Sequence, residues 1–236
     1  MPRDATEWQG RAWCDGHEGA MPGKVIAAAT GKGGAGKSTV IACLATYWAS
    51  KGSKVALIDA DPNQTLARWH SKGSALAGLP LKVETDEHAI IPTVAAFVAD
   101  HDIVLIDCAG FGNQVMIFAI GSADLVVIPV MTDEASIFEA LKTRKIVESA
   151  SQLVKKPIRS RTLLCRVKRS AVAVHARAQL VAFHAEPLTG QLNDRVAFQE
   201  ATFHGSSPTA LLPRGGAARD VDRVAKELEA DIWSRS

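Results

Sequence analysis

The sequence lacks paired cysteines, a long apolar run and a leader of the secretory kind. None of its four cysteines forms a C-x-x-C pair, so neither a disulfide framework nor a structural zinc site is expected. The longest apolar run, residues 125–131, contains a proline and is much shorter than the roughly 20 residues that cross a bilayer. The N-terminus does not show the basic-then-apolar order of a secretion signal. These absences predict reduced thiols and a cytoplasmic chain.

With 236 residues, the chain is long enough for one α/β domain with a large core. Its composition, 47% hydrophobic and 22% charged, is typical of a globular protein. Residues 1–20 are polar and show no periodicity, and Met21 stands just before the first apolar run. We therefore predict a disordered extension over residues 1–20 and a single domain over residues 21–236.

The small net charge of +2 conceals an uneven distribution. Residues 142–177 contain eleven Lys or Arg and a single acid, Glu148, whereas the rest of the chain has 16 bases and 24 acids. Such segregation indicates a surface that faces a polyanion, and a merely solvated basic face is the alternative. The candidate DNA contacts are Lys142, Arg144, Lys145, Lys155, Lys156, Arg166, Lys168 and Arg169.

Apolar runs alternate with helical patterns from residue 25 onward. Runs such as residues 55–58 and 103–106 are continuously apolar, which is typical of parallel strands covered on both faces. The pattern predicts a doubly wound α/β fold with a mostly parallel sheet between helices. The expected strands are 25–30, 54–59, 81–85, 102–107, 124–130 and 161–167, and the expected helices are 37–51, 64–72, 87–99, 113–121, 133–151, 170–184, 194–203 and 217–233.

A glycine-rich segment, residues 31–39, lies between the first strand and the first helix and matches the phosphate-loop pattern. Its glycines allow consecutive backbone N–H groups to surround phosphate oxygens, and the helix that follows directs its positive end at the same anion. Lys37 is expected to reach the β- and γ-phosphates, and the Ser38 hydroxyl to bind Mg²⁺. The predicted nucleotide-binding residues are Gly33, Gly34, Ala35, Gly36, Lys37, Ser38 and Thr39.

Acidic residues follow two of the expected strands. Asp59 and Asp61 end the second strand, and Asp107 closes the fourth in the manner of a Walker B aspartate. The carboxyl ends of parallel strands meet at one edge of a sheet, so these acids are expected near the phosphate loop. Asp107 is expected to hold Mg²⁺ through water. The alternative is that the pair at the second strand caps the helix after it.

The loop carries a second lysine, Lys32, and resembles the Lys-Gly-Gly-x-Gly-Lys-Ser/Thr signature of the ParA/MinD family of deviant Walker ATPases. The sequence after Asp61 is similar to small ParF-like and VirC1-like members. The resemblance implies ATP and Mg²⁺ as cofactors and a homodimer that encloses ATP, with Lys32 reaching the facing nucleotide. It also implies that Asp61 orients the attacking water and that Asp59 supports the Mg²⁺ shell. Residues 163–169 and 192–195 fall where the family lines the base and ribose.

The resemblance further implies a slow ATPase that drives plasmid or chromosome partition. Such a protein binds DNA without sequence preference when dimeric, is stimulated by a ParB/ParG-like adaptor, and is cytoplasmic and nucleoid-associated. The last helix has mixed charges on its polar face, whereas a membrane-targeting helix is basic there. We therefore expect this helix to pack against the domain, and we expect no membrane partner.

Several alternatives share these motifs. A ParA-like ATPase that positions another cargo, such as a conjugation complex, a carboxysome or a chemotaxis cluster, would differ only in its partner. A MinD-like membrane ATPase would differ in its target. A nitrogenase-reductase relative would need cluster cysteines, and nothing supports a dethiobiotin-synthetase-like substrate pocket. A DNA-binding module without catalysis would require purely structural acids.

Overall fold

The computed structural model describes residues 23–110 and 113–233. The predicted disordered extension, residues 1–20, lies outside the described residues, as does Cys14. The other three cysteines, Cys43, Cys108 and Cys165, are buried free thiols. Among the described residues, no helix is both long and apolar enough to cross a bilayer.

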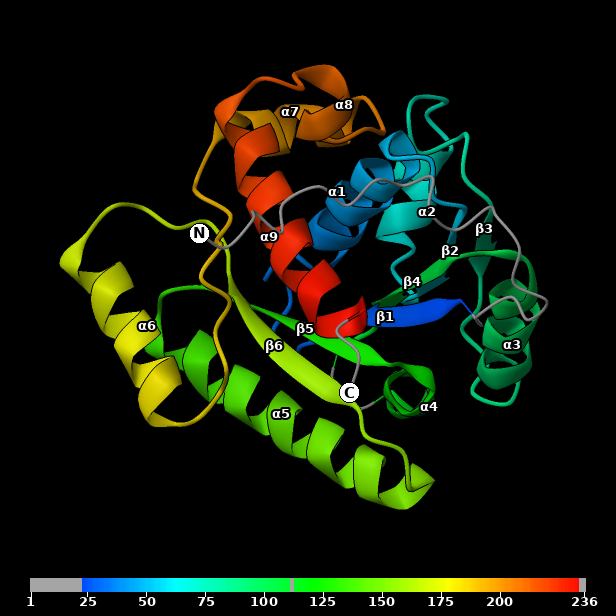
Figure 1. The fold of residues 1–236 in the computed structure, drawn as a ribbon, viewed down its shortest axis with the longest axis horizontal. Coiled ribbons are helices and arrows are strands. Elements are labelled where there is room, and N and C mark those ends of the chain that lie inside the picture. Colours follow the sequence, from blue (N-terminus) through cyan, green and yellow to red (C-terminus); the bar gives the residue numbers. More distant parts are fainter. Residues whose placement is uncertain (1–22, 111–112, 234–236) are drawn as a thin grey trace, which may run out of the picture.

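A six-stranded parallel sheet forms the centre of the fold (Figure 1), in the order β3-β2-β4-β1-β5-β6. This architecture confirms the predicted fold class. All six predicted strands are present with small shifts at their ends. The strands are β1 (Lys24–Ala28), β2 (Val55–Ala60), β3 (Leu81–Val83), β4 (Ile103–Cys108), β5 (Leu125–Val130) and β6 (Arg159–Leu164).

The two faces of the sheet carry different helices because successive side chains of a strand point to opposite sides. In β1, Val25 and Ala27 pack with α3 to α6, whereas Ile26 and Ala28 pack with α1, α2 and α9. All eight predicted helices are present, and the short α8 was not predicted. The helices are α1 (Lys37–Ser50), α2 (Thr65–His70), α3 (Ile90–Asp100), α4 (Gln114–Ser122), α5 (Glu134–Val154), α6 (Ala171–Ala182), α7 (Val196–Phe203), α8 (Pro208–Leu211) and α9 (Gly216–Trp233).

The last helix, α9, packs against the domain as predicted. Its apolar residues Val221, Val224, Ala225 and Leu228 are buried in the core beside α1, and the two helices lie side by side in Figure 1. The apolar face of α9 is therefore occupied by the protein's own core.

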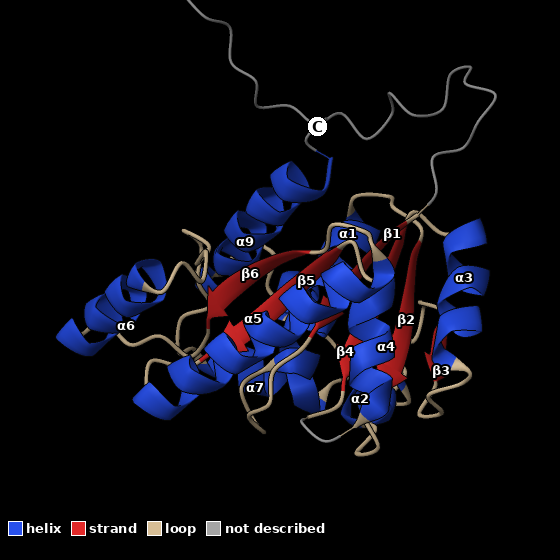
Figure 2. Ribbon diagram, turned by 90° about the horizontal axis from the view of Figure 1, so that it is seen from below, coloured by secondary structure: helices blue, strands red, loops and turns tan. Residues whose placement is uncertain are grey.

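The helices α3 and α6 lie at opposite ends of the molecule (Figure 2).

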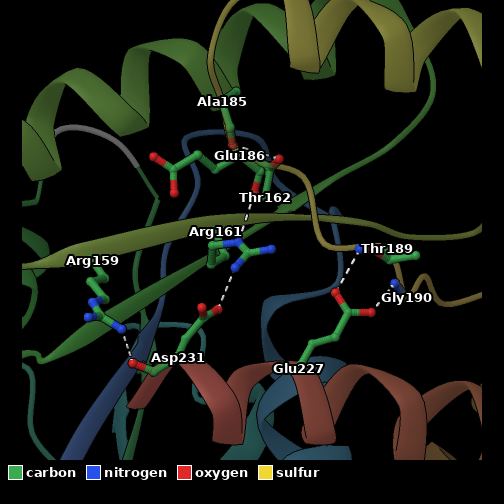
Figure 3. A network of polar contacts seen from close by, with 9 residues as sticks. All are labelled: Arg159, Arg161, Thr162, Ala185, Glu186, Thr189, Gly190, Glu227 and Asp231. Carbon is green, nitrogen blue, oxygen red and sulfur yellow. Dashed lines mark hydrogen bonds and ion pairs between the residues drawn. The ribbon is translucent and has the colours of Figure 1, made fainter. Parts of the chain in front are cut away.

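Acidic side chains on α9 bind β6 and the segment that follows α6 (Figure 3). Glu227 accepts hydrogen bonds from the backbone N–H groups of Thr189 and Gly190, at 2.7 and 2.6 Å. Asp231 forms an ion pair with Arg161 of β6 at 2.6 Å. The helix is thus tied to both β6 and the chain that leads to α7.

Candidate nucleotide-binding site

The phosphate loop connects β1 to α1 at the carboxyl edge of the sheet. Gly34 and Gly36 have positive φ angles of 75° and 106°, which glycine adopts without strain. Gly36 is the N-cap of α1 and has no side chain to satisfy the first N–H groups of the helix, so they can receive an anion. The predicted nucleotide-binding residues, Gly33 to Thr39, all lie in this turn or in the first turn of α1.

Asp107, at the end of β4, is fully buried next to the phosphate loop. Neither of its carboxylate oxygens has a hydrogen-bond partner among the described residues. Burial raises the pKa of this carboxyl to about 7. The nearby Ser38 hydroxyl lowers this pKa, the Asp59 carboxylate raises it further, and the charge of Lys37 lowers it. An unpaired buried carboxylate beside a serine hydroxyl is a donor set that fits Mg²⁺.

This raised pKa predicts a pH-dependent stability of the Mg²⁺-free protein. Between about pH 4 and pH 7 the folded state retains a proton that the unfolded state has released, so the free energy of unfolding falls as pH rises. The slope contributed by this group is at most about 1.4 kcal/mol per pH unit. Asp107→Asn should remove it, as measured by urea denaturation without Mg²⁺ across this range.

Asp100→Asn, at an exposed position at the end of α3, is the matched control and should leave the slope unchanged. If Asp107→Asn kept the wild-type slope, the raised pKa of Asp107 would be contradicted.

Asp59 lies beside Asp107 in the register of β2 and β4, as the sequence predicted. Both of its oxygens accept backbone hydrogen bonds, from the N–H groups of Asp61 at 3.2 Å and of Ala67 at 2.8 Å. Burial nevertheless raises the pKa of Asp59. These contacts favour the alternative reading of Asp59, in which it holds the start of α2 and the loop before it.

Asp61 is half-buried in the loop between β2 and α2. One of its carboxylate oxygens accepts a hydrogen bond from the Asn63 N–H at 2.9 Å. Because its backbone is tied to Asp59, the side chain is held near the carboxyl edge of the sheet. This partly exposed carboxylate is suitably placed to contact a water molecule.

Lys32 is turned toward its own chain. Its Nζ contacts Asp133 at 2.7 Å and the Ser136 hydroxyl at 2.8 Å. Asp133 is also the N-cap of α5 and accepts the Ser136 N–H at 3.0 Å. The hydrogen bond from Lys32 lowers the pKa of Asp133 to about 2. Sequence reasoning missed this partner, although an aspartate at the start of an expected helix is a recognisable capping signal.

A cavity of about 390 Å³ adjoins the phosphate loop. Gly36 and Thr39 line one part of it. Both segments that the resemblance assigned to the base and ribose contribute to it as well, through Cys165 and Arg166 and through residues 192–195, and their contact with a base stays a prediction. Sequence reasoning did not identify the other walls, which come from α2 and α7. These are Trp69, Phe198, Gln199, Thr202 and Phe203.

The eight predicted DNA contacts do not form one cluster. Arg166, Lys168 and Arg169 are exposed just after β6, at the carboxyl edge of the sheet. Lys168 pairs there with Asp194 at 3.5 Å, and Arg166 lines the cavity. Lys155 and Lys156 follow α5 at the opposite edge, where Lys156 pairs with Asp124 at 2.7 Å. The other three lie on α5, and two of them form ion pairs there: Lys142 with Glu139 and Arg144 with Glu148, while Lys145 is exposed.

The fold is that of the MinD/ParA class of P-loop ATPases. The septum-site protein MinD of Pyrococcus horikoshii, solved with Mg-ADP, superposes with a TM-score of 0.72 at 19% identity, over 90% of this chain and 98% of that one. A family model described as VirC1 protein matches residues 23–205. The chain belongs to the VirC1 family, within the ParA/MinD group of proteins.

Two curated proteins are similar over most of their length. Protein ParA of Rhizobium radiobacter is 27% identical over 204 residues, which cover 85% of this chain and 92% of that protein. The maintenance of carboxysome distribution protein A of Halothiobacillus neapolitanus is 26% identical over 210 residues, 86% of this chain and 95% of that protein. The relatives of this chain therefore include a ParA protein and a protein named for maintaining carboxysome distribution.

Proposed function

We propose that this protein is a Mg²⁺-dependent ATPase of the partition type, which dimerises around ATP. The observation that carries the proposal is the unpaired, buried carboxylate of Asp107 beside Lys37 and Ser38 in the phosphate loop. The similarity to a ParA protein and to a MinD solved with Mg-ADP supports the same class of ligand.

Each residue at the carboxyl edge has a distinct role in this proposal. The N–H groups of residues 33–39 and the Lys37 ammonium bind the phosphates. Ser38 and Asp107 would hold Mg²⁺, which neutralises phosphate charge when bound. Asp61 orients the attacking water, and Lys32 from the second subunit stabilises charge on the transferring phosphoryl group. Asp59 supports the Mg²⁺ shell and also holds the backbone of Asp61 through its N–H group.

Calorimetric titration with ATP, with and without Mg²⁺, tests the proposed site. We expect the wild type to bind ATP more tightly with Mg²⁺ than without it. Asp107→Asn should lose this difference in affinity, whereas Asp100→Asn should retain it.

Sedimentation with a non-hydrolysable ATP analogue and Mg²⁺ tests the dimer. A wild-type protein that stayed monomeric under those conditions would overturn the sandwich arrangement.

We also propose that the ATP-bound dimer binds DNA without sequence preference. A dimer presents two copies of each basic group, and bivalent contact raises the apparent affinity for a polyanion steeply. The group of Arg166, Lys168 and Arg169 is best placed, because it lies at the same edge as the nucleotide site. Nucleotide binding and DNA binding would then be coupled.

Charge reversal at two of these positions tests this surface. Lys168→Glu with Arg169→Glu should weaken ATP-dependent DNA retardation by about tenfold or more on any sequence, and should flatten its salt dependence. The matched control is Lys155→Glu with Lys156→Glu, which changes the charge equally at the opposite edge of the sheet. Unchanged retardation in the first variant would place the DNA surface elsewhere.

A second candidate function is the positioning of a cargo other than DNA, which the similarity to a carboxysome-distribution protein favours. Both functions use the same ATP site and a cytoplasmic, nucleoid-associated dimer. They differ in the adaptor that stimulates hydrolysis, which would be ParB/ParG-like for partition. Hydrolysis measured with a candidate adaptor would discriminate between these two functions. Co-sedimentation with liposomes would test the MinD-like alternative, in which the target is a membrane.

A further inference from the structure

The cavity beside the phosphate loop has aromatic walls, to which α7 contributes Phe198 and Phe203 and α2 contributes Trp69. Trp69 lies in the last turn of α2, far in the sequence from the other cavity-lining segments, which belong to α1, the end of β6 and residues 192–203. Its side chain is half-buried and packs against the core cluster that contains α1. The cavity therefore has a large planar side chain next to a site built for phosphate.

Trp69 is held in place by contacts at both ends of α2. At the start of the helix, the Ala67 N–H donates to Asp59 at 2.8 Å. Just after the helix, Lys72 Nζ donates to the Thr202 carbonyl at 2.6 Å. The backbone of Gly205 also comes so close that a Cβ there would lie 2.1 Å from the Trp69 carbonyl oxygen. These contacts fix the backbone of α2 around Trp69 relative to both Asp59 and the chain at the end of α7.

The chemistry of the cavity fits a heteroaromatic base joined to a sugar. Its volume of about 390 Å³ and its direct continuity with Gly36 and Thr39 place a base within reach of a phosphate chain held by the loop. Asn193 and Gln199 add amide donors and acceptors, which can bond to the edge of a base. Indole rings stack well on the faces of nucleic-acid bases.

We propose that Trp69 is a ligand-binding residue against which the base of the bound nucleotide stacks. The proposal rests on the nucleotide binding proposed above and adds to it the residue that recognises the base. It also makes α2 part of the nucleotide site at both ends, since the loop before this helix carries Asp61 and its last turn carries Trp69.

Intrinsic fluorescence provides a direct test, because stacking on a base changes tryptophan emission. The full chain has five tryptophans, and titration with Mg-ADP should change the emission of the wild type. Trp69→Phe should abolish most of this change while it keeps the ADP affinity within about threefold, since phenylalanine still stacks. The matched control Trp233→Phe, at a half-buried position on α9, should retain the change.

Trp69→Ala tests the energetic contribution of the ring. Loss of stacking should weaken Mg-ADP binding by about tenfold or more, measured by calorimetry. Binding of Mg-tripolyphosphate, which has no base, should remain at the wild-type level. A weakened ADP affinity with unchanged tripolyphosphate affinity therefore identifies a base contact, whereas a general distortion of the site would weaken both.

The outcomes separate this inference from the proposed function. A wild type that binds neither ADP nor tripolyphosphate would refute the nucleotide site itself. A wild type that binds ADP, with Trp69→Phe retaining the full emission change, would overturn the stacking role alone. The phenylalanine variant preserves that second test even if the alanine variant fails to fold.

Discussion

Lys32→Ala is expected to reduce ATP hydrolysis by about 10³-fold, because a cation supplied across an interface contributes at least that much to phosphoryl transfer. Binding of ATP should change less than about threefold, since Lys37 and the loop N–H groups remain. Single-turnover hydrolysis and calorimetric titration measure the two quantities separately. Lys54→Ala, which removes an exposed lysine just before β2, is the control and should hydrolyse ATP normally.

The contact of Lys32 with Asp133 and Ser136 sharpens this prediction. To reach a second nucleotide, Lys32 must leave this ion pair, which is partly exposed and therefore inexpensive to break. Asp133→Asn keeps a good N-cap for α5 but removes the charge that retains Lys32. This variant should hydrolyse ATP at least as fast as the wild type. Normal turnover in Lys32→Ala would contradict the role of the lysine across the interface.

Gly205→Ala is expected to lower the free energy of unfolding by about 3 kcal/mol. Gly205 has a φ of 57°, and an added Cβ would lie 2.1 Å from the Trp69 carbonyl oxygen and 2.8 Å from the Lys72 Cβ. The Trp69 carbonyl belongs to backbone and cannot rotate away, so α2 and the chain between α7 and α8 must separate. Urea denaturation at neutral pH measures the loss.

Gly52→Ala is the matched control for this effect. Gly52 also has a positive φ, of 92°, but an added Cβ there meets nothing within 4 Å. It should therefore cost only the backbone term, about 1 to 2 kcal/mol. Equal losses in the two variants would show that the close approach of Gly205 to Trp69 does not contribute to stability.

The sequence predicted the sheet well because its strands are continuously apolar and are separated by clear helical patterns. Residues 103–106 are buried on both faces of the sheet, and such continuously apolar runs are typical of parallel strands covered by helices on both sides. The phosphate loop was equally recognisable, because its function depends on a local order of glycines and lysines. Such features depend on neighbours in the sequence, so they are visible without the fold.

Contacts between distant segments were less predictable. The sequence did not reveal that both oxygens of Asp59 accept backbone N–H groups, one of them at Ala67, eight residues away. Its expected role in the Mg²⁺ shell stays a prediction. The pairing of Lys32 with Asp133 joins residues 101 positions apart. Trp69 and α7 meet at the cavity only because the chain after α6 returns to the phosphate-loop edge. No local sequence pattern predicts such contacts between distant segments.

The acidic residues of α9 have a consequence for shortened versions of the chain. Glu227 binds the backbone at Thr189 and Gly190, and Asp220 binds Arg195 at 2.7 Å, so the helix supports the segment that lines the cavity. A protein truncated before residue 216 would leave those amide groups and Arg195 without their carboxylates. Helix α9 therefore stabilises the cavity wall that we propose to bind the nucleotide. Deletion of α9 should weaken nucleotide binding as well as lower the stability of the fold.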